Sequence, residues 1–183
     1  MSQTENKIKT VQEIINLIEN KDYNKAEKEL LEILKIKKDN YYAHFLLGNV
    51  YGLLKKLESS IEQFKISLKL KADNKITYFN LGVIYDELGI LESSKISFEK
   101  ALQLDPNYLN ANLALAKYYE KIKNFEYAKK FFDKTLSIDK NFLLANQMYG
   151  KFLIKIGEIK KGQYYNYKYS GIIRFNKENY EII

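Results

Sequence analysis

The sequence predicts an all-α solenoid, a stack of helix–turn–helix units with a period of 34 residues. Equivalent residues recur at this spacing without insertion or deletion, as in the series Leu47, Leu81 and Leu115. Within each unit the apolar residues follow the helical period of about 3.6 residues twice, with a polar break between the two sets. A register this regular is typical of one structural unit stacked on copies of itself. We therefore expect five copies, at residues 7–40, 41–74, 75–108, 109–142 and 143–170.

Copy two shows both helices of the unit clearly. Its first apolar set runs from Phe45 to Leu54 and its second from Ile61 to Leu70, and Lys55-Lys56 separates them. Neither set alternates as a strand would. Each copy is therefore expected to form two antiparallel helices of about a dozen residues, joined by a short turn.

The two terminal copies depart from the pattern. In the first helix of copy one, Glu13 and Ile14 replace the usual leucine–glycine pair. In the second helix of copy five, Gly162 stands where alanine or serine is usual, and a tyrosine-rich segment follows. Terminal repeats have one neighbour instead of two, so a more polar outer face is expected at an end of the stack.

Small residues recur at one position of the first helix: Gly48, Gly82, Ala116 and Gly150. A glycine inside a helix costs about 1 kcal/mol relative to alanine. Its repeated use at one register indicates a packing reason, and we expect it to leave room for a neighbouring aromatic ring.

Two terminal segments lie outside the array. Residues 1–6 are expected to be disordered. Residues 171–183 resemble two short strands around a polar turn, a short C-terminal β-hairpin, and an isolated hairpin is only marginally stable in water. Three interpretations remain open: a C-terminal cap, the start of a further domain, or an exposed edge through which the chain forms a homo-oligomer.

Charge and composition limit the classes of partner. The net charge is +7, from 30 basic against 23 acidic residues, but Arg174 is the only arginine. Sequence-specific nucleic-acid recognition favours the planar fork of arginine, so the composition argues against nucleic acid. There is no cysteine, no visible secretory signal and no apolar run near the ~20 residues that span a bilayer. We expect a cytoplasmic protein without a membrane span.

No catalytic constellation is visible. His44 is the single histidine and occupies a position expected to pack in the core. No glycine-rich phosphate loop and no paired-histidine metal motif is present. We expect no catalytic residues, no cofactor and no metal site, and therefore no enzyme activity of the chain alone.

The pattern resembles the tetratricopeptide repeat (TPR), over about residues 7–169. Copy three carries the resemblance best, with Tyr78, Leu81, Gly82, Tyr85, Phe98, Ala101 and Asp105-Pro106. The resemblance implies a right-handed superhelix whose concave groove is lined by the first helix of each copy. The positions that would form a peptide-binding groove are Tyr42, Phe45, Asn49, Ile76, Phe79, Val83, Leu113, Lys117, Lys121, Lys151 and Lys155.

This groove would be aromatic and apolar in copies two and three and basic in copies four and five. It suits a protein or peptide with hydrophobic anchors and acidic residues. Alternatively, the same residues serve only to pack the superhelix or to contact the terminal hairpin. The carboxylate clamp of co-chaperone TPR domains is disfavoured: Asn49 and Asn80 match its asparagines, but Phe45, Asn110 and Ala114 stand at its basic positions.

The predicted function is that of a protein–protein interaction scaffold. Two alternatives remain open at this point. The chain could be the substrate-recruiting region of a larger transferase-type enzyme, or it could be a self-assembling structural scaffold.

Overall fold

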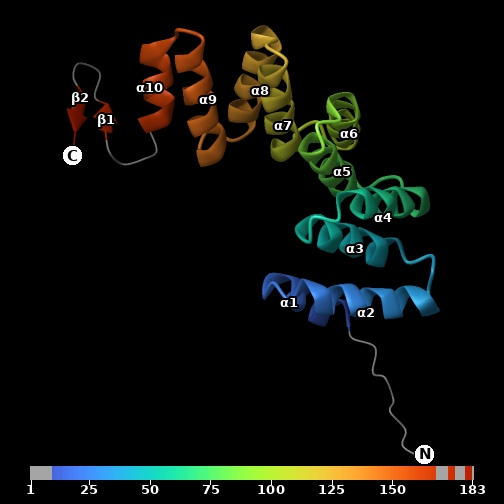
Figure 1. Cartoon of the computed structure of the whole chain (residues 1–183). Coiled ribbons are helices and arrows are strands. Elements are labelled where there is room, and N and C mark those ends of the chain that lie inside the picture. The colour runs from blue at the N-terminus through green and yellow to red at the C-terminus, as the bar shows by residue number, and fades with distance from the viewer. Residues whose placement is uncertain (1–9, 168–172, 176–179, 183) are drawn as a thin grey trace, which may run out of the picture. The chain divides into compact units, whose positions relative to one another are not determined.

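The computed structural model describes residues 10–167, 173–175 and 180–182. They form ten helices and one two-stranded sheet (Figure 1). The chain divides into two compact units, Met1–Leu104 (unit 1) and Asp105–Ile183 (unit 2), and each is described by itself.

Unit 1 consists of three helix pairs in chain order (Figure 1). The first helix of each pair packs against the second, and α2 and α4 also pack against the first helix of the following pair. The expected all-α, helix–turn–helix architecture is confirmed here. The helices are α1 (Val11–Glu19), α2 (Tyr23–Ile36), α3 (Tyr41–Leu53), α4 (Leu57–Leu70), α5 (Lys75–Glu87) and α6 (Leu91–Leu104).

Unit 2 consists of two helix pairs, α7 (Leu109–Lys121) with α8 (Phe125–Ile138) and α9 (Leu143–Lys155) with α10 (Ile159–Tyr167). Two strands follow, β1 (Ile173–Phe175) and β2 (Tyr180–Ile182), which pair antiparallel with Arg174 opposite Glu181. The turn between them, and the expected disorder of residues 1–6, lie outside the described residues.

A residue in the left-handed backbone region lies in the middle of the turn inside every pair. These residues are Lys21, Lys55, Gly89, Lys123 and Gly157, with φ between 60° and 89°. They stand 34 residues apart, so the turn keeps one geometry through all five copies. Glycine adopts this conformation without strain, whereas the three lysines are unusual there. The 34-residue period therefore includes the turns, although three of the five turns have lysine where glycine would have indicated the left-handed conformation.

The small residue of the first helix does make room for a ring in copies two and three. A Cβ at residue 48 would lie 2.6 Å from the Phe64 ring, and one at residue 82 would lie 2.6 Å from the Phe98 ring. Phe64 and Phe98 are consequently buried between their own helix and its partner. The expectation drawn from the glycine register is confirmed for these two copies.

For Gly150 the same expectation is wrong. Its neighbour is Asn166, whose backbone nitrogen would lie 2.7 Å from a Cβ at residue 150. A Cβ at Gly162 would in turn lie 2.6 Å from the carbonyl oxygen of Gly150. Because small residues face each other, α9 and α10 approach backbone to backbone, and no aromatic ring lies between them at this level.

Three polar residues occupy the position where copy three has Tyr78. His44 Nε2 donates to the carbonyl oxygen of Lys38 at 2.9 Å. Asn112 and Asn146 donate to the carbonyl oxygens six residues before them, those of Pro106 and Lys140, at 3.2 and 2.9 Å. Each side chain is buried and ties the start of its helix to the preceding loop. The structural role expected for His44 is therefore confirmed.

Candidate functional site

A hollow of about 490 Å³ lies in unit 1 between α1, α3 and α5. Gly48 and Gly52 stand one helical turn apart on α3 and line the hollow. The ring of Phe64 lies against Gly48, and the end of the Ile84 side chain lies nearest to Gly52. Ile18 of α1 and Val83 of α5 contribute apolar walls. The hollow is therefore a mostly apolar recess on the side of unit 1 formed by the first helices.

Two asparagines lie at this hollow. Asn80 Nδ2 donates a hydrogen bond to Asn49 Oδ1 at 2.8 Å. The amide nitrogen Nδ2 of Asn49 and the side-chain oxygen Oδ1 of Asn80 have no hydrogen-bond partner among the described residues. One donor and one acceptor side by side match the two polar groups of a peptide bond. Lys55 and Glu87 also line the hollow and form an ion pair at 2.5 Å.

The aromatic residues predicted for the groove lie beside the hollow and do not line it. The rings of Tyr42 and Phe45 stack with centroids 5.7 Å apart. Phe79 packs on Phe98 at 5.8 Å, and both Phe45 and Phe79 are half-buried. Ile76 is 45% exposed. Of the six predicted positions in unit 1, Asn49 and Val83 lie at the hollow.

In unit 2 the predicted positions give a basic surface. Lys117 of α7 and Lys151 of α9 are exposed and form no ion pair with the described residues. Lys121 is also exposed, and Lys155 pairs with Glu120 at 2.9 Å. These lysines stand at the registers that hold Asn49, Val83, Leu53 and Glu87 in unit 1.

Leu113, which was expected to line the groove, is instead buried in the core. It is 4% exposed and packs in the core of unit 2 with Phe132 and Tyr149. Its side chain is therefore unavailable to a partner. The exposed apolar residues of this surface are instead Leu144 and Ile154 of α9, which are 52% and 39% exposed.

Almost the whole net charge belongs to unit 2. Residues 105–183 carry 14 lysines and arginines against 8 aspartates and glutamates, a net charge of +6. Residues 1–104 carry 16 against 15, a net charge of +1. A surface of one sign attracts partners of the opposite sign and speeds their association. The two units thus offer surfaces of different chemistry.

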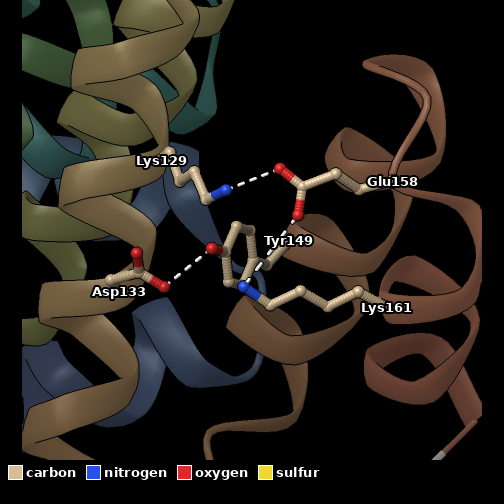
Figure 2. Close-up of polar contacts among 5 residues, drawn as sticks. All are labelled: Lys129, Asp133, Tyr149, Glu158 and Lys161. Carbon is tan, nitrogen blue, oxygen red and sulfur yellow. Dashed lines mark hydrogen bonds and ion pairs between the residues drawn. The ribbon is translucent and has the colours of Figure 1, made fainter.

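A polar cluster joins α8 to α9 and α10 (Figure 2). Tyr149 donates to Asp133 at 2.7 Å, and Lys129 pairs with Glu158 at 2.5 Å. Lys161 lies 4.0 Å from Glu158 and 5.9 Å from the centre of the Tyr149 ring. Burial and the hydrogen bond to Asp133 both raise the pKa of Tyr149, and the hydrogen bond from Lys129 lowers the pKa of Glu158. Every member has a partner, so the cluster holds helices together.

Several lining residues of the hollow, Ile18 and Phe64 among them, were not predicted as groove residues. Ile18 gave no signal because copy one has a degenerate first helix. The register of Phe64 indicated core packing, in agreement with its burial. The available signal was Gly48 followed by Gly52, since two glycines one turn apart remove side chains from one face of a helix. Over the described residues, no helix is long and apolar enough to cross a bilayer, and no three His, Asp or Glu side chains are grouped to hold a metal ion.

Solved structures with similar architecture include MamA, PilF and YrrB. MamA is 21% identical, covering 84% of this chain and 90% of that chain, with a TM-score of 0.75. PilF of Pseudomonas aeruginosa is 20% identical, covering 90% and 75%, with a TM-score of 0.80. YrrB, described as a TPR protein with an unusual peptide-binding site, is 16% identical, covering 88% and 84%, with a TM-score of 0.68. At these identities the likeness concerns the fold.

A comparison with curated protein sequences found no match. The family model of the tetratricopeptide repeat matches three consecutive segments, residues 41–74, 77–108 and 109–142. Together they make up more than half of the sequence, and the structure has a helix pair in each. The chain belongs to the tetratricopeptide repeat family.

Proposed function

We propose that this chain is a protein-interaction scaffold that holds segments of a partner on the faces formed by its first helices. The observation that carries the proposal is the hollow of about 490 Å³ in unit 1. Recesses of this size with apolar walls and a few polar groups are the usual form of a binding site. The peptide-binding site named for YrrB, a protein of the same fold, supports the same interpretation.

In unit 1 the proposed ligand is a peptide with an apolar anchor. Ile18 and Val83 would contact the anchor, whose burial contributes about 25 cal/mol per Å² of apolar surface. Asn49 and Asn80 would hydrogen-bond a peptide group beside it, because one offers a donor and the other an acceptor. The aromatic residues Tyr42, Phe45 and Phe79 would support these walls from the core.

In unit 2 the proposed ligand segment is acidic. Lys117 and Lys151 are exposed and unpaired within the described residues, so carboxylates of a partner would gain charge-assisted hydrogen bonds there. Leu144 and Ile154 would contact apolar side chains of the same segment. Lys121 and Lys155 extend the positive potential. A cytoplasmic location and a homo-oligomer through the C-terminal segment stay predictions from the sequence.

Selection from a display library of random linear peptides tests the proposal. Peptides retained by the full chain should share apolar anchors flanked by acidic residues. Their binding should fall at least about tenfold with Val83→Glu, because the new carboxylate lies at the hollow. Lys117→Glu with Lys151→Glu should weaken acidic peptides further. The matched controls are Ile96→Glu and Lys65→Glu, which change exposed residues on second helices and should leave binding intact.

Equal binding to Val83→Glu and to the wild-type chain would contradict the assignment of the hollow. Circular dichroism of each variant separates a loss of binding from a loss of fold.

A further inference from the structure

Within each unit the second helix of a pair packs against the first helix of the following pair. The structure shows this for α2 with α3, α4 with α5 and α8 with α9. In the part of the chain that the structure describes, no helix follows α10. Among the described residues, therefore, no following helix packs on the face of α10 that corresponds to these junctions.

The junction of α8 with α9 shows which positions receive a following helix. They stand four residues apart, so they form one stripe along α8. One makes an aromatic contact with centroids 6.0 Å apart, one an ion pair and one a 2.7 Å hydrogen bond. They are Phe125, Lys129 and Asp133. Phe125 and Asp133 contact Phe152 and Tyr149 of α9, and Lys129 pairs with Glu158 in the turn that follows α9.

The same stripe on α10, 34 residues later, consists of Ile159, Gln163 and Tyr167. Ile159 is 54% exposed and Tyr167 is 36% exposed, and Gln163 is also exposed. Tyr164, next to this stripe, is 38% exposed. α10 thus presents an aliphatic and two aromatic side chains on a helix of nine residues. Adjacent exposed apolar groups of this kind mark interaction sites more often than scattered ones do.

The charge of α10 indicates what this face accepts. Its first turn holds Lys160, at a register where copies two to four have Glu58, Glu92 and Glu126. α10 contains no acidic residue, and the nearby Glu158 is paired with Lys129 and Lys161. Lys160 is exposed and unpaired among the described residues. A partner that approaches this face therefore gains from carrying acidic groups.

The N-terminal helix α1 of a second copy of the chain does not fit this face of α10. The residues of α1 at the registers of Tyr149 and Phe152 are Glu13 and Asn16. Both are exposed and polar. Stacking α1 of one copy on α10 of another would leave Ile159 and Tyr167 facing polar side chains, so α1 of a second copy does not complete this junction.

We propose that the face of α10 formed by Ile159, Gln163 and Tyr167 docks an acidic amphipathic helix of another protein. The docked helix would occupy the place that the first helix of a sixth copy would take. Its apolar side chains would cover Ile159 and Tyr167, as Phe152 covers Phe125, and its carboxylates would face Lys160. This site is separate from the hollow of unit 1 and from the lysines of α7 and α9.

A peptide made from this chain's own α9 provides the probe. Residues 142–158 carry Tyr149 and Phe152, which pack against α8 in the intact protein. Lys151→Glu and Lys155→Glu make the exposed face of the peptide acidic. Labelled at its N-terminus and titrated with the full chain, this peptide should show saturable fluorescence anisotropy.

Two variants of the full chain test the site. Ile159→Glu removes the exposed aliphatic group, and Gln163→Glu places a like charge at the centre of the stripe. Each should weaken binding of the acidic peptide by about tenfold. Both should keep α10 helical, because an acidic residue near a helix N-terminus is favourable and glutamine and glutamate have similar helix propensities. Ile96→Glu, on α6, and Lys65→Glu, on α4, change exposed residues away from this face and should bind as the wild type does.

Four outcomes would overturn the proposal. They are absence of saturable binding, equal affinity for Ile159→Glu and the wild type, loss of binding in Lys65→Glu, and equal affinity for the peptide with its lysines restored. A dimer in light scattering that Ile159→Glu dissociates would assign the face to a second copy and also overturn it.

Discussion

The hydroxyl group of Tyr149 donates a hydrogen bond of 2.7 Å to the carboxylate of Asp133, which joins α9 to α8 (Figure 2). The ring of Tyr149 is fully buried, with centroids 5.1 Å from Phe132 and 4.9 Å from Tyr165. One side chain therefore connects three helices at the end of unit 2. At the position equivalent to Tyr149, copies two, three and four have Leu47, Leu81 and Leu115.

Tyr149→Phe should remove this hydrogen bond and leave the ring packing intact. Asp133 is exposed and can be solvated by water, so we expect unfolding free energy to fall by only about 1 kcal/mol. Urea denaturation followed by circular dichroism measures the change. A loss as large as that of Tyr149→Ala, expected to be about 3 kcal/mol or more, would mean that the hydroxyl group rather than the ring dominates.

The same hydroxyl group predicts a dependence on pH. Burial raises the pKa of Tyr149 above 10.0, the ordinary value, and the hydrogen bond to Asp133 raises it further. Just above pH 10, the hydroxyl group of Tyr149 therefore stays protonated in the folded state and loses its proton in the unfolded state. The contribution of Tyr149 to stability is complete below about pH 10 and falls as pH rises above it. Stability measured from pH 8 to 11 should fall more steeply in the wild type than in Tyr149→Phe, and parallel curves would contradict this assignment.

Substitution by alanine should change stability in opposite directions at Gly48 and at Gly52. Gly48→Ala places a Cβ 2.6 Å from the Phe64 ring, so the ring must move, and we expect a loss of about 1–3 kcal/mol. In Gly52→Ala the nearest atom is the end of the Ile84 side chain at 3.0 Å, which can shift. Its helix propensity improves by up to about 1 kcal/mol. Thermal unfolding of both variants should show a lowered Tm for Gly48→Ala alone.

Ion pairs at one register have opposite polarity in the two units. Glu27 of α2 pairs with Lys56 at 2.8 Å, and 102 residues later Lys129 of α8 pairs with Glu158. Lys129→Glu should place two carboxylates together, and adding Glu158→Lys should restore the pair. We expect a coupling energy of about 0.5 kcal/mol from the double-mutant cycle in low salt, decreasing at high salt. Additive effects of the two substitutions would show that the pair contributes nothing.

Removing the side chain of Asn146 should lower stability, because two carbonyl oxygens would each lose a hydrogen-bond donor. Its buried amide donates to the carbonyl oxygens of Lys140 and Phe142 at 2.9 and 3.0 Å. Asn146→Ala removes both hydrogen bonds, and we expect a loss of about 1–3 kcal/mol in unfolding free energy. Asn110→Ala, at an exposed position of α7, is the control and should change stability by less than about 0.5 kcal/mol. Similar losses in the two variants would contradict the role given to Asn146.

The helices were predictable because packing imposes the period directly on apolar residues. α3 ends at Leu53 and α4 begins at Leu57, on either side of the Lys55-Lys56 break, as the pattern of copy two indicates. The turns were less visible, since Lys21, Lys55 and Lys123 adopt a backbone conformation usually signalled by glycine. Their conformation follows from the helices that they join.

The candidate site was predictable only in part. Exposure depends on how neighbouring helices pack, so register alone could not show that Leu113 is buried while Leu144 is open. The aromatic neighbour expected at Gly150 was wrong because that contact depends on residue 166, which is asparagine in copy five. The hollow lies between three helices, α1, α3 and α5, and a pattern of apolar residues within one copy does not show how the helices of three copies meet.

Backbone amide shifts in NMR, recorded as a library-selected peptide is added to the full chain, test the central claim most directly. The account predicts the largest changes at Asn49, Asn80 and Val83 of unit 1 and, for acidic peptides, at Lys117 and Lys151 of unit 2. Changes confined to the second helices α2, α4, α6 and α8, with the first helices unaffected, would contradict it.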